Sequence, residues 1–486
     1  MEIPFSTFAL PLSLSIVWLV FLTRRRIHDL YIDVLAIAYS YDLLSSSFRS
    51  GENTFHFTIF GNFVVGLRGN DARKIYFNER YFSTSEGYKM FSKAVPVPAL
   101  AKTLISAEEE HGSHFKKQLD ILVNRDRFSE IIATMLGDIQ RVMSGWHDEG
   151  TLDPFDKIND IAFRVTVHMI TSSDFVSDSS RLSRFQDNFF TQLKNNTPAM
   201  IFLPSFYRSA QKEKEIAITS LFTTLTQFIE AREKTEISLP AVEPIDLLLA
   251  HGLNTQETIQ FILGFLFGSV FNTTKAISWV LIYISMYPQW VSAIRRETEN
   301  VLSKLSSDPS GTLHSKLSKV PVDAWEDSMP TLDLVISETL RLTMNQTAIR
   351  RNIGEDVQIP GGKDIVPSGA FTVYSHADAH LNPEIYPEPW SFQPERFEQG
   401  KQKSSNDFLG WGAGRHRCVG MRIAKLIIKT VVCTFVVTYD FDIKRRKNML
   451  SSTKTITVPD YNKVNEARPK GEVITLNYVK RMEHPR

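Results

Sequence analysis

The fold of this chain is decided by the run Phe408-Leu409-Gly410-Trp411-Gly412-Ala413-Gly414-Arg415-His416-Arg417-Cys418-Val419-Gly420. By residue type alone, a lone cysteine is most often a small buried apolar side chain. In this run Gly412 and Gly414 permit backbone conformations closed to other residues, so the main chain can turn tightly and aim amide hydrogens at the sulfur. The mostly apolar segment 419–437 is predicted to be a helix whose N-terminus lies at Cys418. The helix dipole and the neighbouring basic residues favour a thiolate, the form of cysteine that binds metals.

Two other kinds of site do not match this run. A dinucleotide-binding fingerprint requires a third glycine where Arg417 stands. A zinc site requires more ligands than one cysteine and one nearby histidine supply.

The pattern Trp411-x-x-Gly414-x-His416-x-Cys418-x-Gly420 resembles the haem-binding signature of the cytochrome P450 superfamily. The resemblance implies that Cys418 is the axial ligand of a haem iron and that Trp411, Gly414 and Gly420 shape its loop. It also implies that His416 reaches a haem propionate. The usual aromatic residue at the start is Phe rather than Trp, and the usual residue at position 416 is Arg. The histidine variant also occurs in sterol-processing members of the superfamily.

Composition favours one large catalytic domain, which we expect to span residues 27–486. The chain has 486 residues, of which 43% are hydrophobic, and no Gly/Ser-rich linker or internal repeat divides it. A net charge of +1 argues against a nucleic-acid partner, because phosphate binding requires a basic surface. The chain has 2 cysteines, and with Cys418 assigned to iron a disulfide framework is excluded.

The N-terminal segment predicts a single-pass membrane anchor at residues 1–26. Residues 3–22 carry no acidic or basic side chain, and Arg24-Arg25-Arg26 follows them. An apolar stretch of about 20 residues spans a bilayer, and basic residues after the span remain in the cytosol. A cleaved signal peptide is the competing interpretation, but its basic residues would precede the apolar stretch. We therefore expect an endoplasmic reticulum membrane protein whose catalytic domain faces the cytosol.

Periodicity predicts a helix-rich α+β architecture, mainly α. Residues 54–67 alternate like a hairpin with Gly61-Asn62 as its turn, and extended segments return at 346–375 and at the C-terminus. Long helical stretches are predicted at 127–145, 208–234, 255–305 and 330–343. The apolar run 261–271 is too short to be a second span, so it is predicted to lie in a core helix. The resemblance implies the cytochrome P450 fold, with the haem between a distal and a proximal helix.

An acidic and a basic residue, Glu338 and Arg341, stand three positions apart and therefore share one helix face. Most such pairs are solvated, but this helix is largely apolar, which predicts a buried pair that needs further partners. In the superfamily a downstream Pro-Glu-Arg-Phe motif completes the pair, and residues 394–397 match it. The resemblance thus implies a triad with Arg396 that serves folding and haem retention. It also implies that Arg350, or its neighbour Arg351, binds a haem propionate.

The predicted distal helix contains a polar cluster, Asn272-Thr273-Thr274, within an apolar stretch. Threonine hydroxyls in helices commonly bond the carbonyls of the preceding turn. The resemblance instead implies that Thr273 is the oxygen-activating alcohol. The family's usual acid before it is replaced by Asn272, which cannot release a proton but could position a water that does. The pattern Gly-Ser-x-x-Asn-Thr, with Trp279 six residues later, is similar to sterol and bile-acid hydroxylases and prostacyclin synthase.

Three functions are compatible with this pattern. The first is a monooxygenase that oxidises a terpenoid, sterol, alkaloid or polyketide intermediate of secondary metabolism, as in fungal oxidases. Its haem b would take electrons from NADPH through an external reductase, because the chain has no flavin or iron–sulfur domain. The second is a reductase-independent isomerase or dehydratase, which Asn272 suggests. The third is a non-enzymatic haem or lipid carrier.

Overall fold

The computed structural model describes residues 40–48, 52–92, 112–123, 127–192, 208–234, 243–305, 311–360, 364–398, 407–447, 457–463 and 467–482. The membrane anchor predicted at residues 1–26 lies outside this part of the chain.

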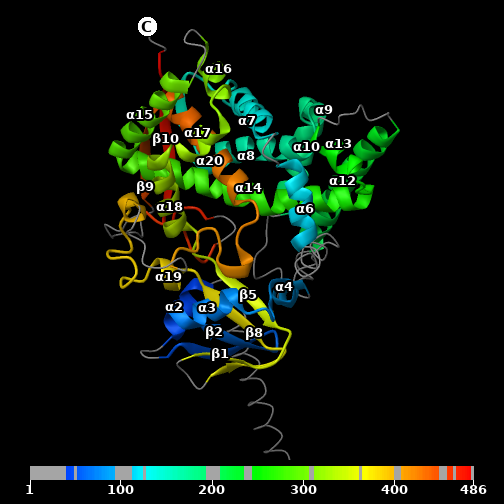
Figure 1. The fold of residues 1–486 in the computed structure, drawn as a ribbon, viewed down its shortest axis with the longest axis vertical. Helices are drawn as coiled ribbons and strands as arrows, with labels where there is room; N and C mark the ends of the chain where they lie inside the picture. Colours follow the sequence, from blue (N-terminus) through cyan, green and yellow to red (C-terminus); the bar gives the residue numbers. More distant parts are fainter. Residues whose placement is uncertain are drawn as a thin grey trace, which may run out of the picture.

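Helices make up most of the molecule, as the periodicity predicts, and most of them gather in the upper part of Figure 1, whereas α2, α3 and α4 lie in its lower part. They are α2 (Ser40–Ser47), α3 (Asn70–Asn78), α4 (Thr84–Ser92), α6 (Gly112–Leu122), α7 (Phe128–Met143), α8 (Pro154–Ile170), α9 (Ser173–Ser177), α10 (Ser179–Thr191), α12 (Arg208–Glu233), α13 (Pro244–Ala250), α14 (Thr255–Met286), α15 (Pro288–Leu305), α16 (Leu313–Ser318), α17 (Val322–Asp327), α18 (Pro330–Thr343), α19 (Ala377–His380) and α20 (Met421–Thr438), with short 3-10 helices η4 (Pro394–Phe397) and η5 (Gly414–His416).

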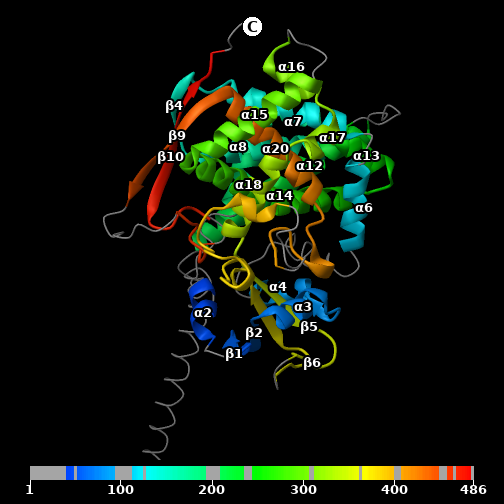
Figure 2. The ribbon, with the colours of Figure 1, turned by 60° about the vertical axis from the view of Figure 1, so that its left-hand side comes forward.

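Strands form three small sheets. The largest has the order β1-β2-β8-β5-β3 and lies at the opposite end from the helical layer, beside α2, α3 and α4 (Figures 1 and 2). The strands are β1 (Thr54–Ile59), β2 (Asn62–Leu67), β3 (Phe82–Ser83), β4 (Glu149–Leu152), β5 (Thr347–Asn352), β6 (Val357–Gln358), β7 (Ile365–Val366), β8 (Phe371–Ser375), β9 (Tyr439–Lys447) and β10 (Glu472–Lys480).

The predicted hairpin at 54–67 is confirmed, but its turn is one residue earlier than expected. Ile59 pairs with Asn62, so the two turn residues are Phe60 and Gly61, with φ of 50° and 75°. Two positive φ values in a two-residue loop match the right-handed twist of the flanking strands. Asn62 is already the first residue of β2, so the predicted turn at Gly61-Asn62 is wrong.

The single helical stretch predicted at 255–305 is two helices. α14 ends at Met286, and Tyr287 adopts a non-helical conformation with φ −129° and ψ 77°. α15 then begins at Pro288. A proline has no backbone N–H to donate and disfavours helical geometry in the residue before it, so it stands naturally at the start of the second helix.

α14 is the central helix of the core. It begins with a capping box, in which Asn254 and Glu257 satisfy each other's backbone N–H groups. It packs against α8, α18 and α20. Within the part of the chain that the structure describes, α14 is the one helix long and apolar enough to cross a membrane, and 67% of its most apolar window is buried. The prediction of a core helix at 261–271 is therefore confirmed.

The cysteine-bearing loop lies where the helical layer meets the large sheet. It is the orange segment that precedes α20, and in both views it passes between α14 and the region of α3 and α4 (Figures 1 and 2). The helical layer and the large sheet therefore both determine the shape of the loop.

The hydrogen bonds of Lys429 on α20 lead to a prediction about stability. The Lys429 ammonium is 2% exposed and donates to the Trp325 and Glu326 carbonyls and to Asp333 Oδ2, at 3.0, 3.0 and 2.8 Å. Lys429→Met leaves these three oxygen atoms without their donor, so we expect the free energy of unfolding to fall by about 2–4 kcal/mol. Urea denaturation followed by circular dichroism measures it.

Lys425→Met is the matched control for Lys429→Met. Lys425 lies one turn earlier on α20, is 37% exposed and stands 3.9 Å from the same carboxylate. An exposed pair contributes little, so the change should stay within about 0.5 kcal/mol. Equal losses in the two variants would show that the buried bonds of Lys429 do not stabilise α20.

Candidate active site

The cysteine loop is held by its own backbone hydrogen bonds. The Cys418 N–H donates to the Trp411 carbonyl at 2.8 Å, and the Gly412 N–H donates to the Leu409 carbonyl at 2.9 Å. The Trp411 ring packs against the main hydrophobic core, which ties the loop to the helices. α20 begins at Met421 directly after the loop, two residues later than the predicted start. Cys418 is thus presented just ahead of a helix N-terminus, as the sequence predicts.

Two glycines of the loop are required by its geometry. Gly412 and Gly414 have φ of 71° and 55°, in the left-handed region that favours glycine. A Cβ at Gly414 would lie 2.4 Å from the Phe77 carbonyl oxygen at the end of α3. A Cβ at Gly412 would lie 2.4 Å from the His416 carbonyl oxygen. The loop therefore closes on itself and docks directly onto α3.

Of the two cysteines, Cys418 is exposed, whereas Cys433 is buried in α20. Desolvation by the surrounding atoms raises the pKa of the Cys418 thiol, and a hydrogen bond from the Gly420 backbone N–H opposes this rise. The preference for the thiolate that the nearby basic residues and the helix dipole predict stays a prediction. A bound metal ion would add to it, since a coordinating thiol is deprotonated outright.

Two contacts from outside fix the start of the loop. The Arg73 guanidinium, 2% exposed on α3, donates to Asp407 Oδ1 at 3.0 Å. The Leu409 N–H donates to His380 Nε2 at 2.8 Å. The first contact comes from α3 and the second from α19, which packs against β8, so two separate segments hold the start of the loop.

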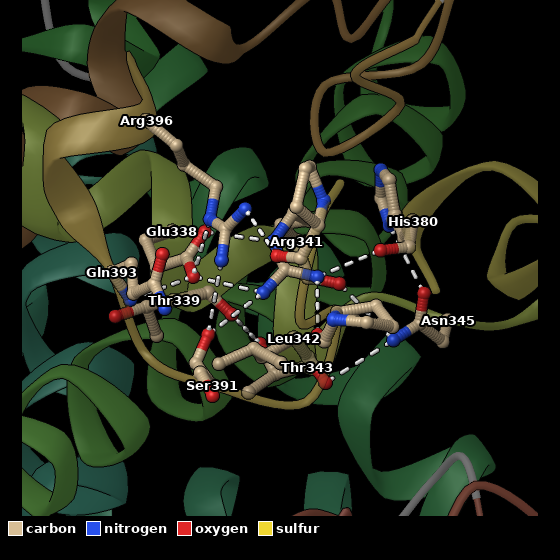
Figure 3. Close-up of polar contacts among 12 residues, drawn as sticks. Glu338, Thr339, Arg341, Leu342, Thr343, Asn345, His380, Ser391, Gln393 and Arg396 are labelled. Atoms are coloured by element: carbon tan, nitrogen blue, oxygen red, sulfur yellow. Dashed lines mark hydrogen bonds and ion pairs between the residues drawn. The ribbon is translucent and has the colours of Figure 1, made fainter. Parts of the chain in front are cut away.

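The structure brings together the three residues Glu338, Arg341 and Arg396 (Figure 3). Glu338 and Arg341 are fully buried and joined by two bonds of 2.7 and 2.8 Å. Arg396 Nε donates to Glu338 Oε1 at 3.1 Å, and the Gln393 backbone N–H donates to the same oxygen at 2.9 Å. The carboxylate is therefore surrounded by donors, which a buried charge requires.

Arg341 uses all five of its N–H groups. Beyond Glu338, its Nη1 donates to the carbonyls of His380 and Pro389, both at 2.7 Å, and its Nη2 donates to the Ser391 carbonyl at 3.2 Å. The guanidinium thus joins α18 to the segment that leads from α19 to η4. This segment is connected in turn to the cysteine loop.

His380 and Asn345 complete that connection, and sequence reasoning missed both. Burial lowers the pKa of His380 well below its usual value, so the ring is neutral and its Nε2 can accept from Leu409. Its Nδ1 bonds Asn345 Oδ1 at 3.0 Å, while Asn345 Nδ2 donates to the Arg341 carbonyl at 3.1 Å (Figure 3). No local pattern in the sequence marks either residue, because their partners lie far along the chain.

A second cluster gathers Arg350, His416 and His376. Arg350 on β5 is 3% exposed, stacks over Tyr76 at 4.3 Å and donates to its carbonyl. Burial first, then the charge of Arg350, lowers the pKa of both His416 and His376 to about 4. His376 Nδ1 is buried and has no hydrogen-bond partner among the residues that the structure describes, and sequence reasoning missed this residue.

On the distal side, Asn272 and Gly268 are exposed one turn apart on a helix whose surroundings are otherwise buried. Asn272 Nδ2 donates to the Gly268 carbonyl at 2.9 Å, and Asn272 Oδ1 has no hydrogen bond to any described residue. Thr273 is 2% exposed, and its hydroxyl has no hydrogen bond within the described residues. Thr274 turns away and donates to Asn159 Oδ1 at 3.1 Å. Thr273 therefore does not bond the preceding turn, although Thr430 and Thr434 do so on α20.

These features fit a haem bound through Cys418. The thiol is exposed at the end of a closed loop, and the distal helix presents a glycine and a free amide oxygen rather than bulky side chains. Arg350 supplies a buried positive charge beside His416, which suits a propionate. Among the residues that the structure describes, no group of three or more His, Cys, Asp or Glu side chains could hold a metal ion by itself. One thiolate supplied by the protein is the donor set of a haem-thiolate centre.

The bond between His380 and Leu409 generates a prediction. His380→Phe removes the acceptor of the Leu409 N–H while keeping a buried aromatic ring of similar size. A net loss of about 1–1.5 kcal/mol should raise hydrogen exchange at the Leu409 amide by roughly tenfold. Exchange mass spectrometry on peptides of the loop measures it, with His251→Phe, an exposed site directly after α13, as the control. Unchanged protection in His380→Phe would show that this bond does not restrain the loop.

Known proteins with similar sequences and folds agree with this geometry. A family model described as cytochrome P450 matches residues 64–464. Cytochrome P450 monooxygenase AacuE of Aspergillus aculeatus is 25% identical over 443 residues, covering 90% of this chain and 88% of that protein. Cytochrome P450 monooxygenase nsrP of Aspergillus novofumigatus is 25% identical, covering 81% and 77%.

A solved structure, retinoic acid-bound cyanobacterial CYP120A1, superposes with a TM-score of 0.70 at 20% identity. The match covers 92% of this chain and 96% of that one, and it establishes the fold. The family model extends over most of the chain, from β2 to the loop before β10, and includes the cysteine loop, the buried triad and α14. The chain therefore belongs to the cytochrome P450 family of oxidoreductases.

Proposed function

We propose that this protein is a haem-thiolate monooxygenase that hydroxylates or otherwise oxidises a hydrophobic small molecule of secondary metabolism. The observation that carries the proposal is the position of Cys418, an exposed residue at the end of a loop closed by its own backbone hydrogen bonds, with its thiol hydrogen-bonded by the Gly420 N–H. The substrate would be a terpenoid, sterol, alkaloid or polyketide intermediate. Two fungal relatives that are named monooxygenases support the reaction class.

When bound, a thiolate-ligated haem supplies the activation of dioxygen and the cleavage of its O–O bond. In this chain Cys418 Sγ would hold the iron, and the Gly420 N–H would draw charge from the sulfur. Arg350, buried beneath the loop, would pair with a propionate, and His416 would stand beside it. Trp411 and Gly414 would shape the loop, the first against the core and the second against α3.

Asn272 and Thr273 are proposed to manage the proton on the distal side. The free hydroxyl of Thr273 can both donate and accept a hydrogen bond, and Asn272 Oδ1 can accept from a water. Together they could hold a water beside the exposed Gly268 and pass its proton inward. This arrangement replaces an ionisable carboxyl with a positioned solvent molecule.

Electrons would come from NADPH through a separate flavoprotein reductase. We place the protein in the endoplasmic reticulum membrane, with residues 1–26 as its anchor and residues 27–486 as one catalytic domain in the cytosol. The hypothesis of a non-enzymatic carrier loses its support, because the chain belongs to an oxidoreductase family.

The two cysteines allow a direct test of the iron ligand. Cys418→Ala should abolish the red-shifted, thiolate-type Soret band of the reduced, carbon monoxide-bound protein. Cys433→Ala is the matched control, because Cys433 is fully buried in α20 and contacts only protein groups such as Thr298. That variant should keep the band. A thiolate-type band that persists in Cys418→Ala would place the ligand elsewhere.

A second function, a reductase-independent isomerase or dehydratase, is favoured by one observation. The exposed polar side chain next to Thr273 on the distal helix is the amide of Asn272, which holds no dissociable proton. A monooxygenase consumes NADPH and dioxygen with each product molecule, whereas an isomerase needs neither.

We expect product to form only when NADPH, reductase and dioxygen are all present. Thr273→Ala should lower product formed per NADPH at least about tenfold, since general acid–base contributions are typically a hundredfold or more. Product analysis with oxidised cofactor and under anaerobic conditions measures the requirement, and Ser46→Ala on the exposed face of α2 is the control. Full turnover without reductase would favour the isomerase.

A further inference from the structure

The helix α3 touches the cysteine loop at two separate points. Arg73 Nη2 donates to Asp407 Oδ1 at 3.0 Å, directly before the loop begins. At the second point, a Cβ on Gly414 would lie 2.4 Å from the Phe77 carbonyl oxygen, so the two backbones are already in contact. Cys418 follows Gly414 by four residues. The position of α3 therefore sets the path of the chain that leads to the thiol.

The same turn of α3 also holds Arg350. The Arg350 guanidinium stacks over the Tyr76 ring at 4.3 Å and donates to the Tyr76 carbonyl, one residue before Phe77. Arg350 comes from β5, and it is the residue that we propose to pair with a propionate. Tyr76 and Phe77 thus support two parts of the proposed haem site from neighbouring positions. A displacement of α3 would move both parts.

Arg73 is the charged side chain that ties this turn to the loop. Its side chain is 2% exposed, and that of Asp407 is 11% exposed. Arg73 Nη2 also donates to Asn70 Oδ1 at 3.1 Å, whereas Nε has no hydrogen-bond partner among the residues that the structure describes. A buried ion pair adds little net stability over apolar side chains of the same volume, but it permits few geometries. Its place under the loop therefore favours a role in position.

Asp378 in α19 connects Arg73 to the large sheet. Asp378 Oδ2 accepts the Gly69 N–H at 3.0 Å and the Tyr374 hydroxyl at 2.7 Å. Gly69 directly precedes α3, and the Tyr374 oxygen lies 3.5 Å from Arg73 Nη1, at the long limit of a hydrogen bond. Burial, and then the charge of Asp378, raises the pKa of Tyr374 well above its usual value, so the phenol keeps the proton that it donates. One carboxylate therefore holds the start of α3 and the neighbour of Arg73.

The ring of Tyr374 packs against the same turn of α3. Tyr374 is fully buried on β8, and its ring centroid lies 5.6 Å from that of Tyr76 and 5.8 Å from that of Phe77. β8 pairs with β5, the strand that carries Arg350. The sheet and α3 thus form one connected unit, and the ion pair of Arg73 with Asp407 joins this unit to the cysteine loop.

We propose that Arg73 is a positioning residue for the Cys418 thiolate. By holding Asp407 against α3, it keeps the sulfur and the Arg350 guanidinium at a fixed separation, so that one haem meets both. Tyr374 and Asp378 act through Arg73, because they fix α3 and the guanidinium rather than the loop itself. The proposal rests on the proposed haem-thiolate function and adds a residue that acts on the iron ligand from outside the loop.

The test uses the reduced, carbon monoxide-bound form of the full-length, haem-loaded protein. A sulfur that leaves its position no longer binds as a thiolate, and the red-shifted Soret band gives way to a band at shorter wavelength. Arg73→Met removes the charged donor but keeps an apolar stem. The ratio of the thiolate-type band to the shorter-wavelength band should fall at least about tenfold, as expected for the loss of a hydrogen bond between charged groups. A ratio that stays at the wild-type value overturns the proposal.

Lys429→Met is the matched control for Arg73→Met. Both side chains are 2% exposed, and each pairs with one aspartate. Lys429 bonds α17 and α18 rather than the loop, so its variant should lose stability in urea yet keep the wild-type band ratio. An equal loss of the thiolate-type band in the two variants contradicts the proposal, because general destabilisation would then control the ligand.

Tyr374→Phe is a milder variant that keeps the test decisive if Arg73→Met does not fold. It removes one neutral hydroxyl and keeps the packed ring, so the band ratio should fall by less, roughly twofold to fivefold. Tyr386→Phe is its control, because the Tyr386 hydroxyl is buried and has no hydrogen-bond partner within the described part of the chain. Equal ratios in these two variants contradict the role given to Tyr374 and Asp378.

Hydrogen exchange gives a second readout that does not depend on the spectrum. Peptides that cover residues 407–418 should exchange faster in Arg73→Met while peptides of α20 keep their protection, and Lys429→Met should show the reverse. Faster exchange in both regions of Arg73→Met contradicts a local role. A wild-type protein without the thiolate-type band contradicts the proposed function, whereas a wild-type band that Arg73→Met retains contradicts only the role of Arg73.

Discussion

The buried bond between Glu338 and Arg341 is the constraint on which the rest of this structure depends. Neither side chain is exposed, so each would be strongly destabilising by itself. Arg341 therefore needs every one of its acceptors, and these come from α18 itself and from the segment between α19 and η4. A fully satisfied network of this kind permits one arrangement of those segments and penalises the others.

Neutral side chains connect this network to the cysteine loop. His380 accepts from Leu409 with one ring nitrogen and meets Asn345 with the other, so the geometry of α18 is passed to the start of the cysteine loop. Farther along, Gly414 rests on the Phe77 carbonyl, which ties the same loop to α3. The thiol is thus positioned by contacts from both layers, while the distal face is one side of a single long helix.

Local features of the sequence could be predicted, and contacts between distant segments could not. The three-residue spacing of Glu338 and Arg341 is visible in the sequence because a helix places both on one face. The hairpin turn was misplaced by one residue because Phe60, with φ of 50°, has no chemical mark of a turn residue. Pro288 is a sequence signal for the end of α14, but the helical pattern continues past it, so the two helices were predicted as one. The pairing of Arg73 with Asp407 joins residues 334 positions apart, and only the folded chain reveals it.

The parallel pairing of β2 with β8 also has a consequence for synthesis of the chain. The Thr372 hydroxyl on β8 donates to the Val65 carbonyl on β2, across 307 residues. At translation rates of 5–20 residues per second, β2 emerges roughly 15–60 s before its partner strand exists. For that interval β1 is its only neighbour, and an apolar strand with an open edge is a target for chaperones and for aggregation. The sheet is therefore a late product of translation, completed only after most of the helices have been made.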